Sequence, residues 1–374
     1  MQRWHGKLAA ILLVVIFVTP TLHAAGARGT AQSAAERVNG ELTFEEQGVR
    51  IAGTVFTWDE LLTLKVTGAA GALPSPHVLR LAGGERWHGR VVSYDADRVR
   101  FDVPEIGVVE LPANTVVGID LKPNLPWPVE RRGVLERREG AAVPSQLLWI
   151  EGEEVAVDSM LGVLTISQEE VLRYTFAEAD EGASHAEEDE LTLISGTLIR
   201  GRMTPGQASV TVEHAVIGER SVPWSEVSAF RRRSGSVVYL ADLEPVEHHT
   251  KPLLAESLPI EAFFRRTDAA GALDAWLLQP ESAVTYELPT VEGPVWLRAV
   301  IAPRRRSQGT VTVRVRAGDA TVWQESVAPD DALRMVDVAL GTARTVTIEL
   351  EYVEPIRFPS GVQLMDPLVL IGGS

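Results

Sequence analysis

The chain has 374 residues, of which 45% are hydrophobic and 23% charged, values typical of folded protein with room for roughly two or three domains. Its formal net charge of −16 disfavours nucleic acids and anionic membranes as partners. It contains no cysteine, which excludes disulfides, thiolate metal sites, haem attached through a C-x-x-C-H motif and thiol nucleophiles.

The first 27 residues predict a signal peptide. Arg3 and Lys7 give a positive start, an apolar run from Leu8 to Val18 follows, and Ala25-Gly26-Ala27 offers a small-x-small cleavage site. The run is shorter than the roughly 20 residues that a membrane span needs, so cleavage is expected and an uncleaved anchor is the alternative. An exported chain without cysteine fits a bacterial periplasm, the extracellular space or the cell surface.

Residues 28–40 are expected to form a linker before a region rich in short β-strands. From 41 to 233, β-branched and aromatic residues alternate with polar ones between clusters of Gly, Pro and Asp. A degenerate repeat of about 25 residues recurs there: a strand, a turn with glycine, a second strand and a short turn into a last strand. Its four copies run from Leu42 to Leu61, from Val99 to Val117, from Val155 to Val171 and from Val210 to Val227.

Two copies, those starting at Val99 and Val210, are preceded by an additional strand and a glycine turn. These lead to Gly89-Arg90 in one copy and to Gly201-Arg202 in the other. The whole unit resembles a small SH3-like or Sm-like barrel, in which a strand bends at a glycine so that the sheet can close. We therefore predict one SH3/Sm-like module at 41–126 and a second SH3/Sm-like region at 127–233. Spacer or protein-contact roles are expected for these modules.

An acidic stretch interrupts the second region at 178–190. It contains small residues and carboxylates without periodicity, so a solvated linker or long loop is expected. Clustered carboxylates make calcium binding an alternative, but the D-x-D-x-D-G spacing of an EF-hand is absent.

From about Ser236 the strands become longer, which predicts a two-sheet β-sandwich over 236–374. The order of its segments resembles the NPCBM/NEW2 family of galactose-binding-like, jelly-roll β-sandwiches, which are attached to secreted bacterial proteins and some glycosidases. The segments that carry the resemblance are Val238–Glu247, Ser282–Leu288, Trp296–Ile301, Val313–Asp319 with Val322-Trp323, Val336–Val338 and the strand ending at Tyr352. The resemblance implies a carbohydrate-binding type of module.

The chain departs from this family in its loops. The stretch Ala275–Pro280 lacks the family's glycines and histidine, and only Asp366 remains of a His-x-Asp-Trp-x-Asp pattern near the end. Fold therefore carries over better than ligand binding does. The candidate ligand-binding residues are Trp276, whose indole could stack on a sugar ring, together with Gln279 and Asp366. For Trp276, however, a buried loop anchor is favoured over such a stacking platform.

Other prominent side chains favour structural roles. The tryptophans at positions 58, 224, 296 and 323 are expected in cores, and the adjacent His248 and His249 in solvent. The arginine triplets 231–233 and 304–306 could hold an anion, but in an acidic chain salt bridges or solvated loop ends are favoured. Motifs for nucleotide binding, zinc hydrolysis or serine hydrolysis are absent from the sequence. No catalytic residue, metal ligand or cofactor is therefore predicted.

Three functions remain open. The leading one is an exported, non-catalytic binding or scaffold protein whose sandwich docks a polysaccharide or another cell-envelope component. The second is a structural or assembly protein with protein partners only, including copies of itself, whose sandwich has lost its pocket. The third is an unrecognised glycoside hydrolase or its accessory, which needs only two suitably placed carboxylates.

Overall fold

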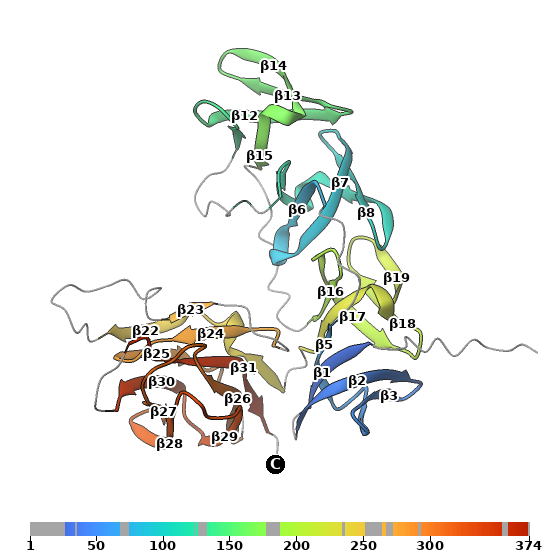
Figure 1. Cartoon of the computed structure of the whole chain (residues 1–374). Coiled ribbons are helices and arrows are strands. Elements are labelled where there is room, and N and C mark those ends of the chain that lie inside the picture. The colour runs from blue at the N-terminus through green and yellow to red at the C-terminus, as the bar shows by residue number, and fades with distance from the viewer. Residues whose placement is uncertain are drawn as a thin grey trace, which may run out of the picture.

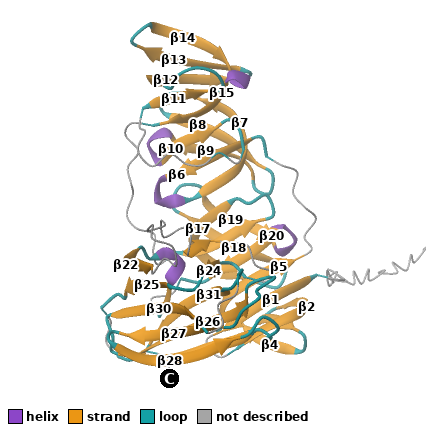
Figure 2. Cartoon of the chain, turned by 60° about the vertical axis from the view of Figure 1, so that its left-hand side comes forward, coloured by secondary structure: helices purple, strands orange, loops and turns teal. Residues whose placement is uncertain are grey.

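The protein is nearly all β in the computed structural model (Figure 1), and the helices of its described part are single 3-10 turns (Figure 2). The structure describes residues 27–33, 36–67, 75–123, 125, 133–176, 188–233, 236–250, 264–266, 272–290, 293–353 and 358–372. The predicted signal peptide lies outside these residues except for Ala27. Within the described part, no helix has the length and apolar character needed to cross a bilayer.

The first group of strands, unit 1, is built from five antiparallel strands. They are β1 (Arg28–Ser33), β2 (Arg37–Glu45), β3 (Gly48–Ile51), β4 (Thr54–Thr57) and β5 (Leu61–Thr67). Each strand pairs with the next from β1 to β4, and β5 returns to pair with β1. The expected linker at 28–40 is therefore wrong. Its residues form β1 and the start of β2, and Ala31 is fully buried because β1 lies between two strands.

The same pairing scheme recurs in three further units. Unit 2 comprises β6 (His77–Leu81), β7 (Arg86–Tyr94), β8 (Arg98–Val103), β9 (Gly107–Pro112) and β10 (Val116–Asp120). Unit 3 comprises β11 (Val134–Arg137), β12 (Val143–Glu151), β13 (Glu154–Ser159), β14 (Gly162–Ser167) and β15 (Val171–Thr175). Unit 4 comprises β16 (Asp189–Leu193), β17 (Leu198–Pro205), β18 (Ser209–His214), β19 (Gly218–Pro223) and β20 (Val227–Arg231). A 3-10 turn precedes the last strand of each, as the repeat predicted: η2 (Ala113–Thr115), η3 (Gln168–Glu170) and η4 (Trp224–Glu226).

A glycine in the second strand allows the close approach that this scheme needs. A Cβ at Gly89 of β7 would lie 2.1 Å from the carbonyl oxygen of Asp102, and one at Gly201 of β17 would lie 2.5 Å from that of Glu213. Only glycine fits there without a shift of backbone. The first half of β7 pairs with β6 and its second half with β8.

The repeat is confirmed in three copies and misplaced by one strand in the first. The copies starting at Val99, Val155 and Val210 begin in the third strand of units 2, 3 and 4. The copy starting at Leu42 begins in β2, the second strand of unit 1. Leu42-Thr43-Phe44 in β2 and Val49-Arg50-Ile51 in β3 show the same alternation of apolar and polar residues. Alternation alone therefore cannot tell which of the two strands is the third of the unit.

The units join through equivalent strands. β5 of unit 1 pairs antiparallel with β20 of unit 4, and β10 of unit 2 pairs antiparallel with β15 of unit 3. β7 also contacts β17 and β12, so the units follow one another in the order 1, 4, 2, 3, from bottom to top in Figure 1. Their buried side chains form one continuous core. The range 41–126 thus covers most of units 1 and 2, and 127–233 covers units 3 and 4.

The C-terminal region is a two-sheet antiparallel sandwich, as predicted. One sheet has the order β23–β24–β31–β26–β29 with β21 beside β31, and the other has the order β22–β25–β30–β27–β28. Strands of the first sheet are β21 (Val237–Tyr239), β23 (Phe264–Arg266), β24 (Ala275–Leu278), β26 (Val295–Pro303), β29 (Arg334–Gly341) and β31 (Val362–Ile371). Strands of the second are β22 (Pro245–Thr250), β25 (Ser282–Glu287), β27 (Val311–Ala317), β28 (Ala320–Val327) and β30 (Thr345–Tyr352). Alternate residues of both sheets fill the core between them.

Candidate functional site

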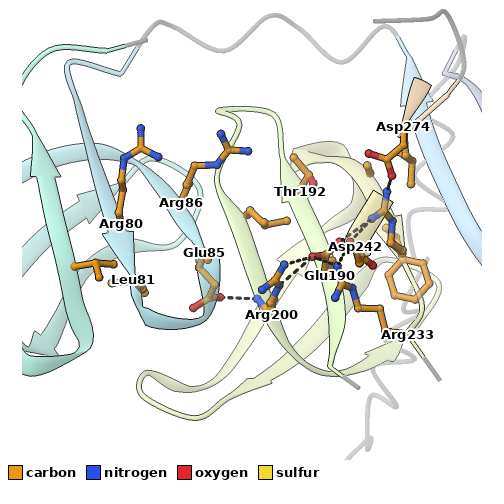
Figure 3. Close-up of a pocket in the computed structure, with 17 residues that line it drawn as sticks. Arg80, Leu81, Glu85, Arg86, Glu190, Thr192, Arg200, Arg233, Asp242 and Asp274 are labelled. Atoms are coloured by element: carbon orange, nitrogen blue, oxygen red, sulfur yellow. Dashed lines mark hydrogen bonds and ion pairs between the residues drawn. The ribbon is translucent and has the colours of Figure 1, made fainter. Parts of the chain in front are cut away.

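A charged pocket of about 490 Å³ lies where units 2 and 4 meet the sandwich (Figure 3). Its walls come from the turn after β6, from β16, β17 and β20, from η5 (Leu240–Asp242) and from the segment before β24. Its charged side chains are Arg80, Glu85, Arg86, Glu190, Arg200, Arg231, Arg233, Asp242 and Asp274.

Glu190 lies at the centre of the pocket's ion pairs. Its Oε1 accepts hydrogen bonds from Arg200 Nη2 at 2.7 Å and lies 2.8 Å from Arg233 Nη2, while its Oε2 is 3.4 Å from Arg231 Nη1. Burial acts to raise the pKa of Glu190, but attraction to the arginines outweighs it and leaves the pKa below its usual value. The carboxylate therefore stays ionised. The prediction of a solvated loop at 178–190 is wrong for its last two residues. Asp189 and Glu190 belong to β16, and Glu190 is buried.

Arg231 and Arg233 connect unit 4 to the sandwich. The guanidinium of Arg231 donates to Asp274 and lies over the ring of Tyr239, 4.5 Å from its centroid. Arg233 Nη2 donates to Asp242 Oδ1 at 2.9 Å. The sequence alternative of salt bridges for this triplet is confirmed, and the third member, Arg232, lies 3.7 Å from Asp59.

Glu85 connects unit 2 to unit 4 on the other side of the pocket. Its Oε1 accepts the backbone N–H of Arg200, and its Oε2 lies 3.1 Å from Nε2 of His214. Nδ1 of His214 accepts the backbone N–H groups of Val216 and Ile217. Because Nδ1 is an acceptor, the proton of His214 resides on Nε2 and is donated to Glu85.

These contacts leave the pocket's central charges compensated within the protein. Three arginines, at 200, 231 and 233, face three carboxylates, at 190, 242 and 274. Among the described groups, only the Nε atoms of Arg231 and Arg233 in this cluster are buried without a hydrogen-bond partner. A buried cluster balanced in this way fixes the mutual position of the elements that supply it.

Asp366 forms a second bridge, between the sandwich and unit 1. Its Oδ1 accepts the N–H groups of Leu273 and Asp274 at 2.7 and 2.8 Å, and its Oδ2 lies 3.0 Å from Arg37 Nη1. Burial raises the pKa of Asp366, against the opposing attraction of Arg37. The carboxylate of Asp366 thus bridges the 273–274 segment and β2. These contacts give it a structural role that needs no ligand.

Trp276 is buried, as expected for a loop anchor, and is not the exposed stacking platform that a ligand-binding role would need. Its side chain is 6% exposed and packs in the sandwich core, because β24 pairs with β31 and both of their faces are covered. Gln279 is half-buried just past the opposite end of β24, where its backbone carbonyl accepts the hydroxyl of Ser282. Trp276, Gln279 and Asp366 therefore do not converge on one pocket.

The other expectations from the sequence have mixed outcomes. Trp58 and Trp224 stack with ring centroids 5.4 Å apart and are confirmed as packing residues, while Trp296 and Trp323 are half-buried against cores. His248 and His249 are exposed on β22. No cluster of three or more potential metal ligands occurs in the part of the chain that the structure describes.

Sequence reasoning missed most of the pocket. Arg231 and Arg233 were noted as members of the arginine triplet 231–233. Glu190, however, was expected in a loop, and no role was predicted for Asp274 or Arg200. One usable signal was the alternation of Glu190 and Thr192 with Leu191 and Leu193, which predicts a strand that begins at the acidic residue.

Comparison with known proteins gives a limited likeness. No protein-family model matches the chain, and no curated protein matches it in sequence. Among solved structures, a family 51 carbohydrate-binding module of Clostridium perfringens, in complex with methyl-galactose, aligns with 36% of this chain and 99% of its own at 11% identity and a TM-score of 0.29. Tandem family 51 modules of a family 98 glycoside hydrolase from Streptococcus pneumoniae align with 88% of each chain at 10% identity and a TM-score of 0.30. A family 6 module of Clostridium stercorarium in complex with cellobiose has 14% identity and a TM-score of 0.24. The NPCBM/NEW2 resemblance remains a prediction.

Proposed function

We propose that this chain is an exported, non-catalytic scaffold protein whose four SH3/Sm-like units and sandwich act as one rigid body in the cell envelope of a bacterium and present surfaces to protein partners. The observation that carries this proposal is that the charged side chains of the pocket form ion pairs with one another between the modules. Arg231 and Arg233 of unit 4 bind Asp274 and Asp242 of the sandwich, so the side chains best able to bind a ligand are occupied in joining the modules.

The pKa of Glu190 also favours a structural role over a hydrolytic one. A general acid in a glycosidase needs a carboxyl whose pKa is raised towards neutrality. The arginines around Glu190 lower its pKa instead. Hydrolysis therefore has no support from the central carboxylate of this pocket.

Differential scanning calorimetry of the purified chain tests the joined body. We expect the units and the sandwich of the unchanged chain to unfold in one coupled transition. Arg231→Leu should separate the transition of the sandwich from that of the units, and Arg98→Leu, which removes an exposed ion pair with Glu110, should not. Two independent transitions in the unchanged chain, unaffected by Arg231→Leu, would reject a joined body.

Export is tested separately. The chain expressed with its own N-terminus in a Gram-negative host should appear in the periplasmic fraction. N-terminal sequencing should then begin at Arg28, the first residue of β1. Retention of the whole chain in the cytoplasm would refute this part of the proposal.

A second candidate function is glycan docking by the sandwich at a groove other than the predicted site. An open groove of about 690 Å³ lies beside η5, β22 and the end of β25. Apolar side chains of Leu243 and Val246 line it together with the carboxylates of Glu244 and Glu287. Sugar rings offer apolar C–H faces and hydroxyl donors that such a lining could receive.

Binding of the full chain to a panel of cell-envelope, plant and algal polysaccharides tests this candidate. Val246→Asp should abolish any binding at the groove, whereas Val322→Asp, at an exposed position of β28, should leave it intact. Absence of binding across the panel would leave protein partners as the proposed role.

A further inference from the structure

β14 of unit 3 has an open edge at one end of the row of units. In the described residues β14 pairs only with β13, and it lies at the far end of the molecule from the sandwich (Figures 1 and 2). An open strand edge presents unpaired backbone donors and acceptors to another strand. Unit 3 is also the terminal unit, since β10 and β7 of unit 2 cover its other side.

The residues of β14 lack the features that usually protect such an edge. Its sequence from Gly162 to Ser167 contains neither a charged residue nor proline. The equivalent strand β9 contains Glu110 and Pro112, and β19 contains Glu219, Arg220 and Pro223. Charges and prolines on an edge hinder pairing with another chain, so β14 lacks a protection that β9 and β19 have. The equivalent strand of unit 1, β4, lacks it as well but is only four residues long.

The hairpin that ends in β14 also exposes apolar side chains. Met160 and Leu161 at the tip are 98% and 84% exposed, and Val163 is 64% exposed. Among the described residues, no other stretch of four holds three exposed large hydrophobic side chains. A patch of this kind next to an open edge marks an interaction surface.

The register shows which backbone groups face outward. The N–H of Gln168 donates to the carbonyl of Glu153, the pair that continues the β13–β14 ladder. Hydrogen-bonded pairs alternate along an antiparallel ladder. The N–H and C=O groups of Val163, Thr165 and Ser167 therefore point away from β13 towards the open edge.

We propose that two copies of this chain associate by antiparallel pairing of β14 with β14 across a two-fold axis at Thr165. Val163 then pairs with Ser167 of the other copy, and Leu164 faces Ile166 on the inner side, so every opposed pair within β14 is uncharged and both sheets keep the same face inward. This inference rests on the proposed scaffold function, because it names one of the protein partners.

Two observations favour a second copy over a foreign strand. The chain already joins its units by antiparallel pairing of equivalent strands, β5 with β20 and β10 with β15, and the β14 pair repeats this between copies. The strand is also self-complementary, because the outward N–H and C=O groups of Val163, Thr165 and Ser167 meet those of an identical strand about a two-fold axis at Thr165.

Because the chain contains no cysteine, one introduced thiol reports the contact directly. Opposed residues in a hydrogen-bonded pair lie about 5.5 Å apart at Cα, within the range of a disulfide. Under mild oxidation, full-length Thr165→Cys should form a covalent dimer in high yield. Ser221→Cys, at the equivalent exposed position of β19, should remain monomeric.

Sedimentation velocity supplies the second measurement. The unchanged chain should show a concentration-dependent dimer that Thr165→Lys and Thr165→Glu each abolish and that an equimolar mixture of the two variants restores. A monomer at all concentrations up to about 100 μM, or a dimer that both variants retain, would overturn the proposal. Calorimetry tests the joined body within one chain, so either result can fail without the other.

Discussion

The guanidinium of Arg231, at the end of β20, donates a hydrogen bond to the carboxylate of Asp274, the residue that precedes β24 of the sandwich. Both side chains are less than a tenth exposed. A charge pair this deeply buried costs desolvation energy, which other contacts of the pair must offset. Here Glu190 and Tyr239 provide those contacts, and the result is a fixed junction between two modules.

Breaking this pair should destabilise the chain strongly. Arg231→Met leaves Asp274 buried without its main cation, and removal of one partner of a buried pair costs about 3–5 kcal/mol. Urea unfolding followed by tryptophan fluorescence should show this loss, while the double variant Arg231→Met/Asp274→Leu should recover much of it. A single variant as stable as the unchanged chain would contradict a structural role for the pair.

The glycine bends should be intolerant of a methyl group. Gly89→Ala brings a Cβ within 2.1 Å of the carbonyl of Asp102, so β7 must shift. We expect a loss of about 1–3 kcal/mol or more in the free energy of unfolding. Gly206→Ala, where the nearest atom is 3.3 Å away, serves as the milder control. Equal effects of the two changes would argue against the bend.

Trp276→Ala should impair folding rather than remove a ligand contact. Deletion of a buried tryptophan side chain costs about 3–5 kcal/mol. Circular dichroism and thermal melting should show a destabilised sandwich, whereas Trp276→Phe should retain more stability. An unchanged melting temperature for Trp276→Ala would mean that the indole does not support the core.

Protonation of His77 should lower the free energy of unfolding as the pH falls from about 6.5 towards 4. Burial first, and then the charges of Arg90 and Lys122, lower its pKa from 6.5 to about 4. The unfolded chain therefore binds a proton in this interval that the folded chain does not, and stability falls as the pH falls from 6.5 towards 4. Because one pKa unit is worth about 1.4 kcal/mol, the effect is roughly 2–3 kcal/mol.

His77→Asn keeps an acceptor for the N–H of Val91 and removes the titration. Its free energy of unfolding should change less between pH 7 and pH 4 than that of the unchanged chain. Parallel pH profiles for the two proteins would contradict the assignment to His77.

The sequence predicted the fold better than the site, for a physical reason. Alternation along a strand is a local property, so Thr345–Tyr352 and the repeat units could be recognised, and a glycine bend could be expected at Gly89. The contact between Arg231 and Asp274 joins residues 43 apart in the sequence, and no local pattern links them. Trp276 was ambiguous because a tryptophan before a loop suits both a core and a platform. Its place in the core is seen only in the folded chain, where β24 pairs with β31 and the indole is buried in the sandwich.

Distance measurement by pulsed electron paramagnetic resonance tests the central claim of a rigid scaffold most directly. Spin labels on Ser221→Cys of unit 4 and Ser326→Cys of the sandwich, both exposed, are specific because the chain has no other cysteine. We expect one narrow distance distribution in the otherwise unchanged chain and a broad one when Arg231→Met is added. A broad distribution in the chain with Arg231 intact would contradict the claim of a rigid scaffold.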